Sequence, residues 1–189
     1  MRINEIFLSL QGEGHFTGTP AVFLRFSGCN LSCPFCDTKH ETFTEMSEEE
    51  LVREVTSYPV EHVVITGGEP GLQLTKTLVD RLHQFGRFIQ IETNGSMPLP
   101  HGIDWVTCSP KEGAEVVLEH VDEVKMLYSG QGCDLSKGEY LHAKEYRLQP
   151  LDTGDEARNK QIVCDTINYI LEHPKWKLSL QTHKILNVR

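Results

Sequence analysis

The chain lacks any apolar run long enough to cross a membrane. No stretch of its 189 residues approaches the ~20 consecutive apolar residues that a membrane-spanning helix needs. The N-terminal segment, Met1-Arg-Ile-Asn-Glu5, also lacks the extended apolar region of a secretory signal peptide. These absences predict a cytoplasmic protein with no membrane partner, in which thiols stay reduced.

Positive charge is also scarce. The 27 Asp and Glu outnumber the 18 Lys and Arg, so the formal net charge is −9. An acidic chain is poorly suited to neutralising nucleic-acid phosphates, which argues against a nucleic-acid partner. Internal repeats, low-complexity tracts and linkers are absent as well, and the length suits one domain spanning residues 1–189.

Cysteine is concentrated in one place. Three of the 6 cysteines stand in Cys29-Asn-Leu-Ser-Cys33-Pro-Phe-Cys36. Thiolates suit iron–sulfur clusters, zinc or copper(I), and this spacing lets one short loop surround a single inorganic centre. A closed zinc site uses four protein ligands, whereas an active centre keeps a position open. No fourth cysteine or histidine follows at matching spacing, which favours a [4Fe–4S] cluster with one open iron.

The alternative is a structural zinc site that borrows a distant ligand, such as His40 or Cys108. The chain would then be a zinc-binding module and not an enzyme, and Gly67-Gly-Glu-Pro70 would have no explanation. Cys108 and the two other scattered cysteines, Cys133 and Cys164, are interpreted as buried or incidental thiols.

Strand and helix patterns alternate along the chain. Short apolar runs over residues 62–66 and 88–92 predict buried parallel strands, and Ser47-Glu-Glu-Glu50 is a capping box that begins a helix. Such alternation implies parallel strands with crossover connections. About six repeating strands are too few for a closed eight-stranded barrel. We therefore expect an α/β fold, an incomplete βα barrel with about six parallel core strands and a reduced helical layer.

Three further elements are expected in the second half of the chain. A short helix is predicted over residues 112–120, and the longest helix over residues 155–173. That helix places Val163, Ile167 and Ile170 on its apolar side. A final strand is predicted over residues 176–182.

Polar residues near the strand ends are candidates for binding. Arg25 interrupts the apolar run Val22-Phe-Leu-Arg-Phe26, so it faces either solvent or a buried anion, because an unpaired buried charge is costly. With Gln11-Gly-Glu-Gly14 it becomes a candidate carboxylate clamp. Thr38 is either a turn residue or an oxygen ligand for Mg²⁺. His183 is either a substrate contact or a surface residue.

The cysteine spacing and Thr66-Gly-Gly-Glu-Pro70 together resemble the radical S-adenosylmethionine (SAM) superfamily. In that superfamily the three cysteines hold a [4Fe–4S] cluster whose open iron binds SAM, and the Gly-Gly-Glu-Pro motif holds the SAM amino group. An electron from the cluster cleaves SAM to a 5′-deoxyadenosyl radical. The resemblance implies a radical SAM fold and activity for this chain.

Six more motifs narrow the resemblance to the 7-carboxy-7-deazaguanine synthase family, over nearly the whole chain from Ile6 onward. They are Leu10-Gln-Gly-Glu-Gly14, Phe23-Leu-Arg-Phe-Ser-Gly-Cys-Asn30, Cys36-Asp-Thr38, Glu92-Thr-Asn-Gly95, Ser109-Pro-Lys111 and Leu180-Gln-Thr-His-Lys184. This family implies a lyase of queuosine-type 7-deazapurine biosynthesis. It contracts the ring of 6-carboxy-5,6,7,8-tetrahydropterin with loss of ammonia, giving 7-carboxy-7-deazaguanine.

The resemblance also implies site residues, with no catalytic side chain because SAM and the cluster carry the radical chemistry. The implied substrate contacts are Leu10, Gln11, Gly12, Glu13, Arg25, Thr66, His183 and Arg189. The implied SAM contacts are Phe35, Cys36, Asp37, Gly67, Gly68, Glu69, Ser109, Pro110, Lys111 and Gln149. The implied metal ligands are Cys29, Cys33 and Cys36 for the cluster and Thr38 for Mg²⁺.

The family further implies a homodimer and a flavodoxin- or ferredoxin-type reductant. The segment between Cys36 and Ser47 is shorter than in longer members, which carry extra elements around the cluster. A glycyl-radical-enzyme activase is the rival enzymatic interpretation, because it uses the same cysteine spacing. It would act on a protein and would leave Gln11-Gly-Glu-Gly14 and Arg25 without a role.

Overall fold

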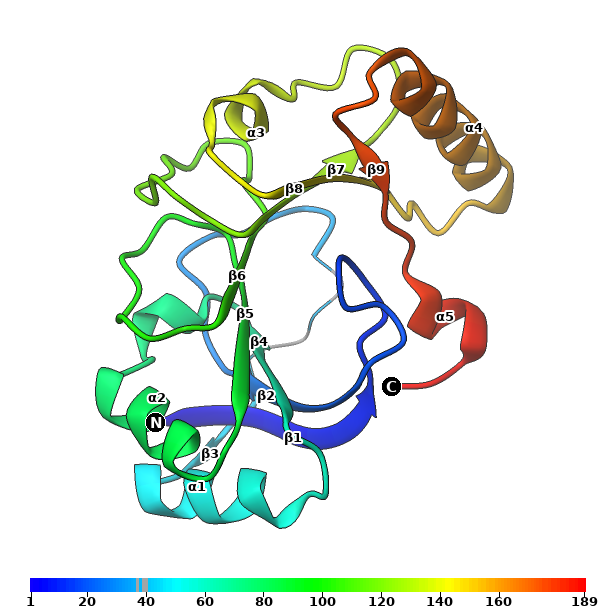
Figure 1. Cartoon of the computed structure of the whole chain (residues 1–189). Helices are drawn as coiled ribbons and strands as arrows, with labels where there is room; N and C mark the ends of the chain where they lie inside the picture. The colour runs from blue at the N-terminus through cyan, green and yellow to red at the C-terminus, as the bar shows by residue number, and fades with distance from the viewer. Residues whose placement is uncertain (37, 39–40) are drawn as a thin grey trace.

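A single curved sheet organises the computed structural model, which describes residues 1–36, 38 and 41–189. Its strand order is β3-β1-β2-β4-β5-β6-β7-β8-β9 (Figure 1). Pairing is parallel from β2 through to β9, whereas β1 is antiparallel to both β2 and β3. The strands are β1 (Arg2–Leu10), β2 (Pro20–Phe26), β3 (Thr44–Glu45), β4 (His62–Gly67), β5 (Phe88–Thr93), β6 (Trp105–Cys108), β7 (Glu123–Tyr128), β8 (Glu145–Pro150) and β9 (Lys177–Leu178).

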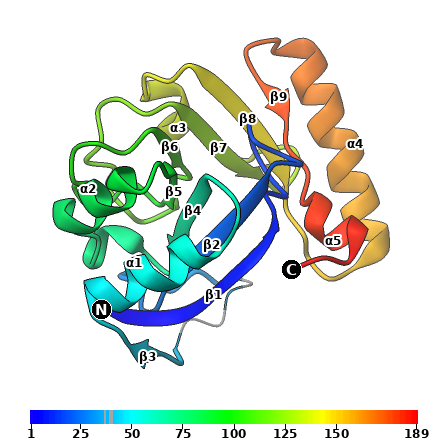
Figure 2. The same ribbon diagram turned by 60° about the horizontal axis from the view of Figure 1, so that its bottom comes forward.

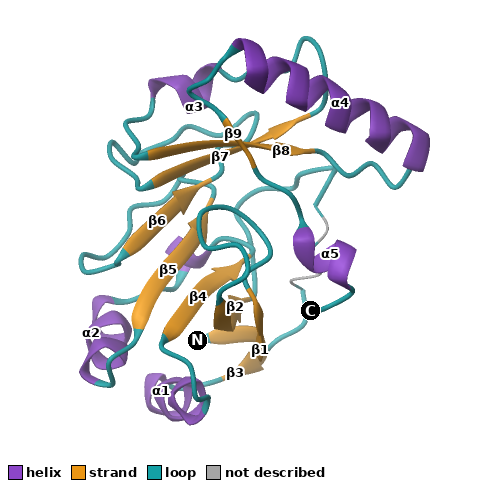
Figure 3. Cartoon of the chain, turned by 45° about the vertical axis from the view of Figure 1, so that its right-hand side comes forward, coloured by secondary structure: helices purple, strands orange, loops and turns teal. Residues whose placement is uncertain are grey.

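The sheet bends into a barrel that does not close. Figures 1 and 3 show the C-terminal segment lying between the β1 side of the sheet and the β8–β9 side. Six parallel strands, β2 and β4 to β8, have four or more residues, and β9 adds a two-residue pairing. The predicted incomplete βα barrel is therefore confirmed.

The helical layer is reduced, as predicted. Helices α1 and α2 cover the outer face beside β2, β4 and β5, and α4 packs outside β8 and β9 (Figure 2). Loops alone connect β5 to β6 and β6 to β7. Among the described residues, no helix has the length and apolar character to span a membrane. The helices are α1 (Glu48–Ser57), α2 (Lys76–Gln84), α3 (Ser136–Tyr140), α4 (Glu156–Glu172) and α5 (Thr182–Leu186), with a 3₁₀ turn, η1 (Pro70–Leu72).

The two faces of β2 show how the sequence produces both core and site. Val22, Leu24 and Phe26 alternate along the strand and are fully buried in the core under α1 and α2. Phe23 and Arg25 point to the opposite, concave face, because successive side chains of a strand alternate between faces. One face of β2 therefore packs in the core, and the other face presents Arg25 to the concave side of the sheet.

The capping box predicted at Ser47 is present and fixes the start of α1. The Glu50 amide donates to Ser47 Oγ at 3.2 Å, and the Ser47 amide donates to Glu50 Oε2 at 2.8 Å. These reciprocal bonds satisfy two amides that lack helical partners. Leu51, Val52 and Val55 form the buried side of the helix, as expected.

The predicted helix over residues 112–120 is wrong. This segment is a turn followed by irregular chain, and Gly113 has a φ of 76°. Its backbone groups bond elsewhere: the Val117 amide donates to Gly95 O at 2.9 Å, and Lys137 Nζ donates to Ala114 O at 2.6 Å. Tertiary partners therefore replace the local hydrogen bonds of a helix.

Two predictions near the C-terminus also need correction. The last strand is only Lys177–Leu178, and the chain then turns into α5, whose Thr182 amide donates to Gly12 O at 2.9 Å. In α4 the buried positions are Ile162 and Thr166. Of the predicted apolar side, Ile170 packs against the core, whereas Ile167 is 40% exposed. The buried side of α4 is thus rotated from the predicted one, because the Thr166 hydroxyl can be buried while it donates to Ile162 O at 2.6 Å.

Candidate functional site

A cleft of about 830 Å³ opens on the concave face of the sheet. It collects polar residues that follow the carboxyl ends of the parallel strands, where open α/β sheets and barrels bind ligands. All eight implied substrate contacts line it: Leu10, Gln11, Gly12, Glu13, Arg25, Thr66, His183 and Arg189. The implied cofactor and metal residues that line it are Cys29, Cys33, Cys36, Thr38, Phe35, Gly67, Gly68, Ser109, Lys111 and Gln149.

The three clustered cysteines line this cleft as free thiols. Cys29 and Cys33 are half-buried, and Cys36 is exposed. Within the described ranges, no three His, Cys, Asp or Glu side chains gather closely enough to bind one metal ion. A zinc ion needs its sulfurs converging on one atom at about 2.3 Å, whereas thiolates around a [4Fe–4S] cluster bind different irons. All three thiols line one cleft, as the ligands of a single cluster must.

Of the two ligands that a structural zinc site could borrow, the structure describes only Cys108, and its position does not support such a site. Cys108 is fully buried beneath Gly95, where a β-carbon would come within 2.5 Å of its sulfur, and it does not line the cleft. Burial also raises the pKa of the Cys108 thiol to about 12, which disfavours a thiolate. His40 lies outside the described residues, as does the implied SAM contact Asp37.

The glycine loop after β4 packs directly on the start of the cysteine loop. The Glu69 amide donates to Gly28 O at 3.0 Å. A β-carbon at Gly68 would lie 2.1 Å from Gly28 O and 2.8 Å from Cys29 Cβ. Only glycine permits this approach, so the two predicted motifs form one surface of the cleft.

Glu69 and Pro110 are the two described SAM candidates that do not line the cleft; both are buried. The Glu69 carboxylate accepts hydrogen bonds from the Thr93 hydroxyl, the Asn94 amide and the Gly71 amide, each at 2.8 Å. Glu69 therefore joins the glycine loop to the end of β5, where Thr93 and Asn94 do line the cleft.

Arg25 faces the cleft and is paired with a carboxylate. Its Nε donates to Glu5 Oε1 at 2.8 Å, and its Nη1 lies 3.5 Å from Thr38 Oγ1. The structure thus places the candidate carboxylate clamp beside the candidate Mg²⁺ ligand, although they are separated by the cysteine loop in sequence.

A buried charged cluster forms the floor of the cleft, and sequence reasoning missed two of its three members. Lys125 Nζ lies 2.7 Å from Glu13 Oε2 and 2.9 Å from Glu92 Oε2. Only Glu13 was among the predicted contacts. The signal available in the sequence was the alternation of Glu123 and Lys125 within an otherwise apolar strand, because both side chains then share one face of the sheet.

The pKa values of the two glutamates in this cluster, Glu13 and Glu92, are shifted in opposite directions. Burial alone would raise the pKa of Glu13, but the charge of Lys125 and hydrogen bonds from Lys125 and Gln181 lower it to about 2. For Glu92 burial prevails, and with Glu13 and Glu123 nearby its pKa rises to about 7 despite Lys125. Burial opposes the charge on Lys125, but the two glutamates raise its pKa above the ordinary value. The floor thus pairs a permanent cation with one fixed and one titratable carboxyl.

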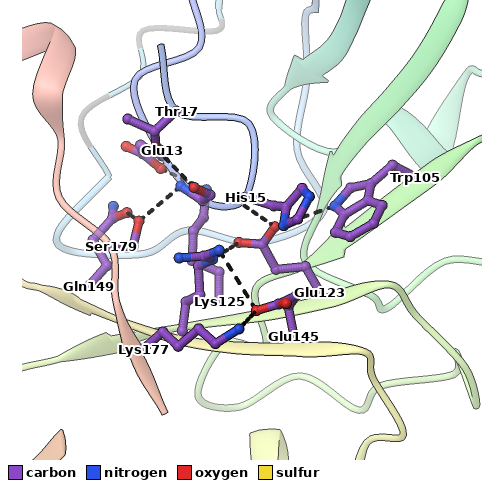
Figure 4. Close-up of polar contacts among 12 residues, drawn as sticks. Glu13, His15, Thr17, Trp105, Glu123, Lys125, Glu145, Gln149, Lys177 and Ser179 are labelled. Atoms are coloured by element: carbon purple, nitrogen blue, oxygen red, sulfur yellow. Dashed lines mark hydrogen bonds and ion pairs between the residues drawn. The ribbon is translucent and has the colours of Figure 1, made fainter. Parts of the chain in front are cut away.

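A second buried carboxylate supports the loop that follows β1. Glu123 is fully buried; its Oε2 accepts from the His15 amide at 3.0 Å and from Trp105 Nε1 at 3.3 Å, and its Oε1 lies 3.3 Å from Arg147 Nε (Figure 4). The Gly14 amide donates to Ser179 Oγ at 3.0 Å. These contacts hold the loop that presents Gln11, Gly12 and Glu13 to the cleft.

The C-terminal segment completes the wall beside this loop. The hydroxyl and the amide of Thr182 both donate to Gly12 O at 2.9 Å, and Gln181 Nε2 donates to Glu13 Oε1 at 3.0 Å. His183 and Arg189, the last residue, therefore reach the cleft from the opposite end of the sequence.

Comparisons with known proteins agree with this geometry. Residues 24–128 match the Radical SAM superfamily. The chain is 53% identical over 188 residues to 7-carboxy-7-deazaguanine synthase of Bacteroides thetaiotaomicron, covering 100% of this chain and 98% of the relative. The enzyme of the same name from Bradyrhizobium diazoefficiens is 38% identical, over 99% of this chain and 98% of the relative.

A solved structure extends the likeness to three dimensions. The crystal structure of QueE from Escherichia coli superimposes with a TM-score of 0.79 at 29% sequence identity, covering 95% of this chain and 92% of that chain. Sequence and fold thus agree over nearly the full length, and the chain belongs to the 7-carboxy-7-deazaguanine synthase family of the Radical SAM superfamily.

Proposed function

We propose that this protein, as one radical SAM domain, converts 6-carboxy-5,6,7,8-tetrahydropterin into 7-carboxy-7-deazaguanine and ammonia in the cleft. The conversion balances without a further co-reactant, because the nitrogen lost by the pterin ring leaves as ammonia. The observation that supports this proposal is that one cleft brings together the cysteine loop, Arg25 and the Lys125 cluster. The relatives named 7-carboxy-7-deazaguanine synthase support the same reaction.

Cys29, Cys33 and Cys36 would hold the [4Fe–4S] cluster, and the neighbouring glycine loop with Phe35, Ser109 and Lys111 would hold SAM. When bound, the cluster and SAM supply the radical that takes hydrogen from the substrate carbon bearing the carboxylate. The chain itself contributes binding, orientation and exclusion of water. Because Gly68 carries no side chain, the glycine loop packs against Gly28 and Cys29, and it lines the cleft beside the cysteines where SAM would bind.

The rest of the cleft suits a flat, polar ring with one carboxylate. The Arg25 guanidinium is positioned to bind the carboxylate, and Thr38 beside it would contribute a hard oxygen to Mg²⁺ shared with the substrate. Phe7 and Phe23 are stacked with ring centroids 5.0 Å apart and form an apolar wall. The Lys125 cluster opposite offers donors and acceptors to the ring nitrogens and carbonyl.

We also propose a homodimer in the cytoplasm that receives electrons from a flavodoxin or ferredoxin. Cys36 is exposed, so a cluster bound there would lie near the surface, within reach of a docked reductant. The homodimer is proposed from the family resemblance alone.

The test is an anaerobic assay of cluster-reconstituted protein with SAM, Mg²⁺, a reductant and 6-carboxytetrahydropterin, read by mass spectrometry. We expect 7-carboxy-7-deazaguanine from the wild type, with at least a 100-fold loss in Arg25→Ala and with a dependence on Mg²⁺ that Thr38→Ala weakens. Arg53→Ala, on the outer helix α1, is the matched control. SAM cleavage by the wild type without this product would overturn the substrate assignment and favour the activase interpretation.

A further inference from the structure

Glu5 carries one carboxylate between two guanidinium groups from opposite ends of the chain. Its Oε1 accepts from Arg25 Nε at 2.8 Å, and its Oε2 accepts from Arg189 Nη2. The side chains of Glu5 and Arg25 are 29% and 20% exposed, so this pair is partly shielded from solvent. Charge-assisted bonds in such a setting are stronger than those between neutral groups.

Glu5 accepts its hydrogen bond from Nε, on one edge of the Arg25 guanidinium. Nε faces Glu5, whereas Nη1 faces Thr38 at the cleft. A guanidinium is planar and its donors are fixed in that plane, so holding Nε fixes the direction of the remaining donors. Glu5 thereby leaves the cleft-facing edge of Arg25 available to a carboxylate and sets its orientation.

The other oxygen of Glu5 anchors the end of the chain. Arg189 is 66% exposed, yet its guanidinium carbon lies 4.5 Å from the centre of the Phe7 ring, and its carbonyl oxygen accepts from the Ser9 hydroxyl. Arg189 and Phe7 both line the cleft. Contacts with Glu5, Phe7 and Ser9 of β1 thus hold Arg189 over the apolar wall. Among them, the contact with Glu5 is the ion pair.

We propose that Glu5 is a positioning residue that couples Arg25 and the C-terminal Arg189 into one substrate-binding unit. It orients the carboxylate clamp and holds the C-terminal segment over the bound ring. This inference rests on the proposed function for its substrate, but the link between Glu5 and the C-terminal segment is independent of it. Two measurements separate these parts.

The first measurement needs no substrate. Amide hydrogen exchange of cluster-reconstituted Glu5→Gln should become at least about tenfold faster over residues 184–189 than in the wild type, because the charged anchor is lost. Asp80→Asn, which removes a carboxylate from the exposed Lys76–Asp80 pair on α2, should leave exchange there unchanged. Unchanged exchange in Glu5→Gln would overturn the link, whether or not the proposed reaction is correct.

The second measurement uses steady-state kinetics with 6-carboxytetrahydropterin. Glu5→Gln and Arg189→Gln should each raise KM about tenfold or more, with kcat within threefold of the wild type, and the double variant should be no worse than the worse single variant. Removal of the terminal residue, Arg189, cannot disrupt the core and provides a second test of the coupling. Additive effects, or a fall in kcat at constant KM, would overturn the coupling. Absence of product from the wild type would instead reject the proposed function.

Discussion

The imidazole of His183 lies against Gly12 so closely that a β-carbon on Gly12 would come within 2.2 Å of Nδ1 and 2.8 Å of His183 Cβ. Two segments from opposite ends of the sequence therefore touch with no room for a side chain. The Thr182 hydroxyl and amide add two hydrogen bonds to Gly12 O at the same point. The shape of this part of the cleft therefore depends on Gly12 having no side chain. The motif Gln11-Gly-Glu-Gly14 by itself indicates only a turn there.

Gly12→Ala tests this contact. We expect α5 to be displaced, because the added methyl group overlaps the ring and not a flexible side-chain end. The KM for the pterin substrate should rise at least tenfold, and amide exchange over residues 182–188 should accelerate. The iron content should stay at the wild-type level, because the neighbours that the added methyl group would displace belong to α5 and not to the cysteines. Unaltered exchange together with unaltered KM would contradict this account.

Glu123→Gln tests the buried ion pair beneath the loop. The substitution removes the nearer and fully buried of the two carboxylates that pair with Arg147, and leaves only the longer pair with Glu145 at 3.7 Å. Loss of one partner of a buried ion pair is costlier than removing both. We expect the free energy of unfolding to fall by about 3 kcal/mol, measured by anaerobic denaturant titration. The matched control, Glu156→Gln, removes a carboxylate from an exposed pair with Lys160 on α4 and should change stability by less than about 0.5 kcal/mol. Equal effects of the two substitutions would argue against a special role for Glu123.

Five of the six cysteines should separate into two groups by iron content. Single substitutions of Cys29, Cys33 or Cys36 by Ala should abolish stable [4Fe–4S] binding after reconstitution, read by iron analysis and by visible absorbance. Cys133→Ala and Cys164→Ala should retain full iron, because neither thiol lines the cleft. Stoichiometric zinc in aerobically purified wild type, with loss of zinc in Cys108→Ala, would support the structural zinc site instead.

Glu92 should impose a pH dependence on stability. Burial raises its pKa from the usual 4.5 to about 7, so between these values the folded protein binds more protons than the unfolded chain. The free energy of unfolding therefore falls as pH rises through this window, by at most about 1.4 kcal/mol per pH unit for this one group. Glu92→Gln removes this slope.

The measurement is thermal unfolding of wild type and Glu92→Gln at several pH values from 4.5 to 7. The difference in Tm, variant minus wild type, should become steadily more positive as pH rises. The control is Glu156→Gln, which removes an exposed carboxylate and should not change the pH dependence of Tm. A Tm difference that is constant with pH would show that Glu92 titrates at its usual pKa.

Local signals determined much of this protein. The cysteine spacing, the Gly-Gly-Glu-Pro loop, the capping box at Ser47 and the alternation in β2 are each set by neighbouring residues, so the family, the incomplete barrel and most strands were predictable from the sequence. The candidate substrate contacts came from the family resemblance, and their role stays a prediction; the structure shows that all eight line one cleft.

Tertiary structure alone decided which distant residues meet. The segment over residues 112–120 is not helical, because its Val117 amide bonds to Gly95 and its Ala114 carbonyl bonds to Lys137. Lys125 joins Glu13 and Glu92, and Glu5 joins Arg25 and Arg189, only because the curved sheet brings strands and chain ends together. Such pairings depend on long-range packing and on the loss of water around charges. No local sequence pattern encodes long-range packing or the loss of water. The Lys125 cluster and the contacts of Glu5 could therefore be identified only from the tertiary structure.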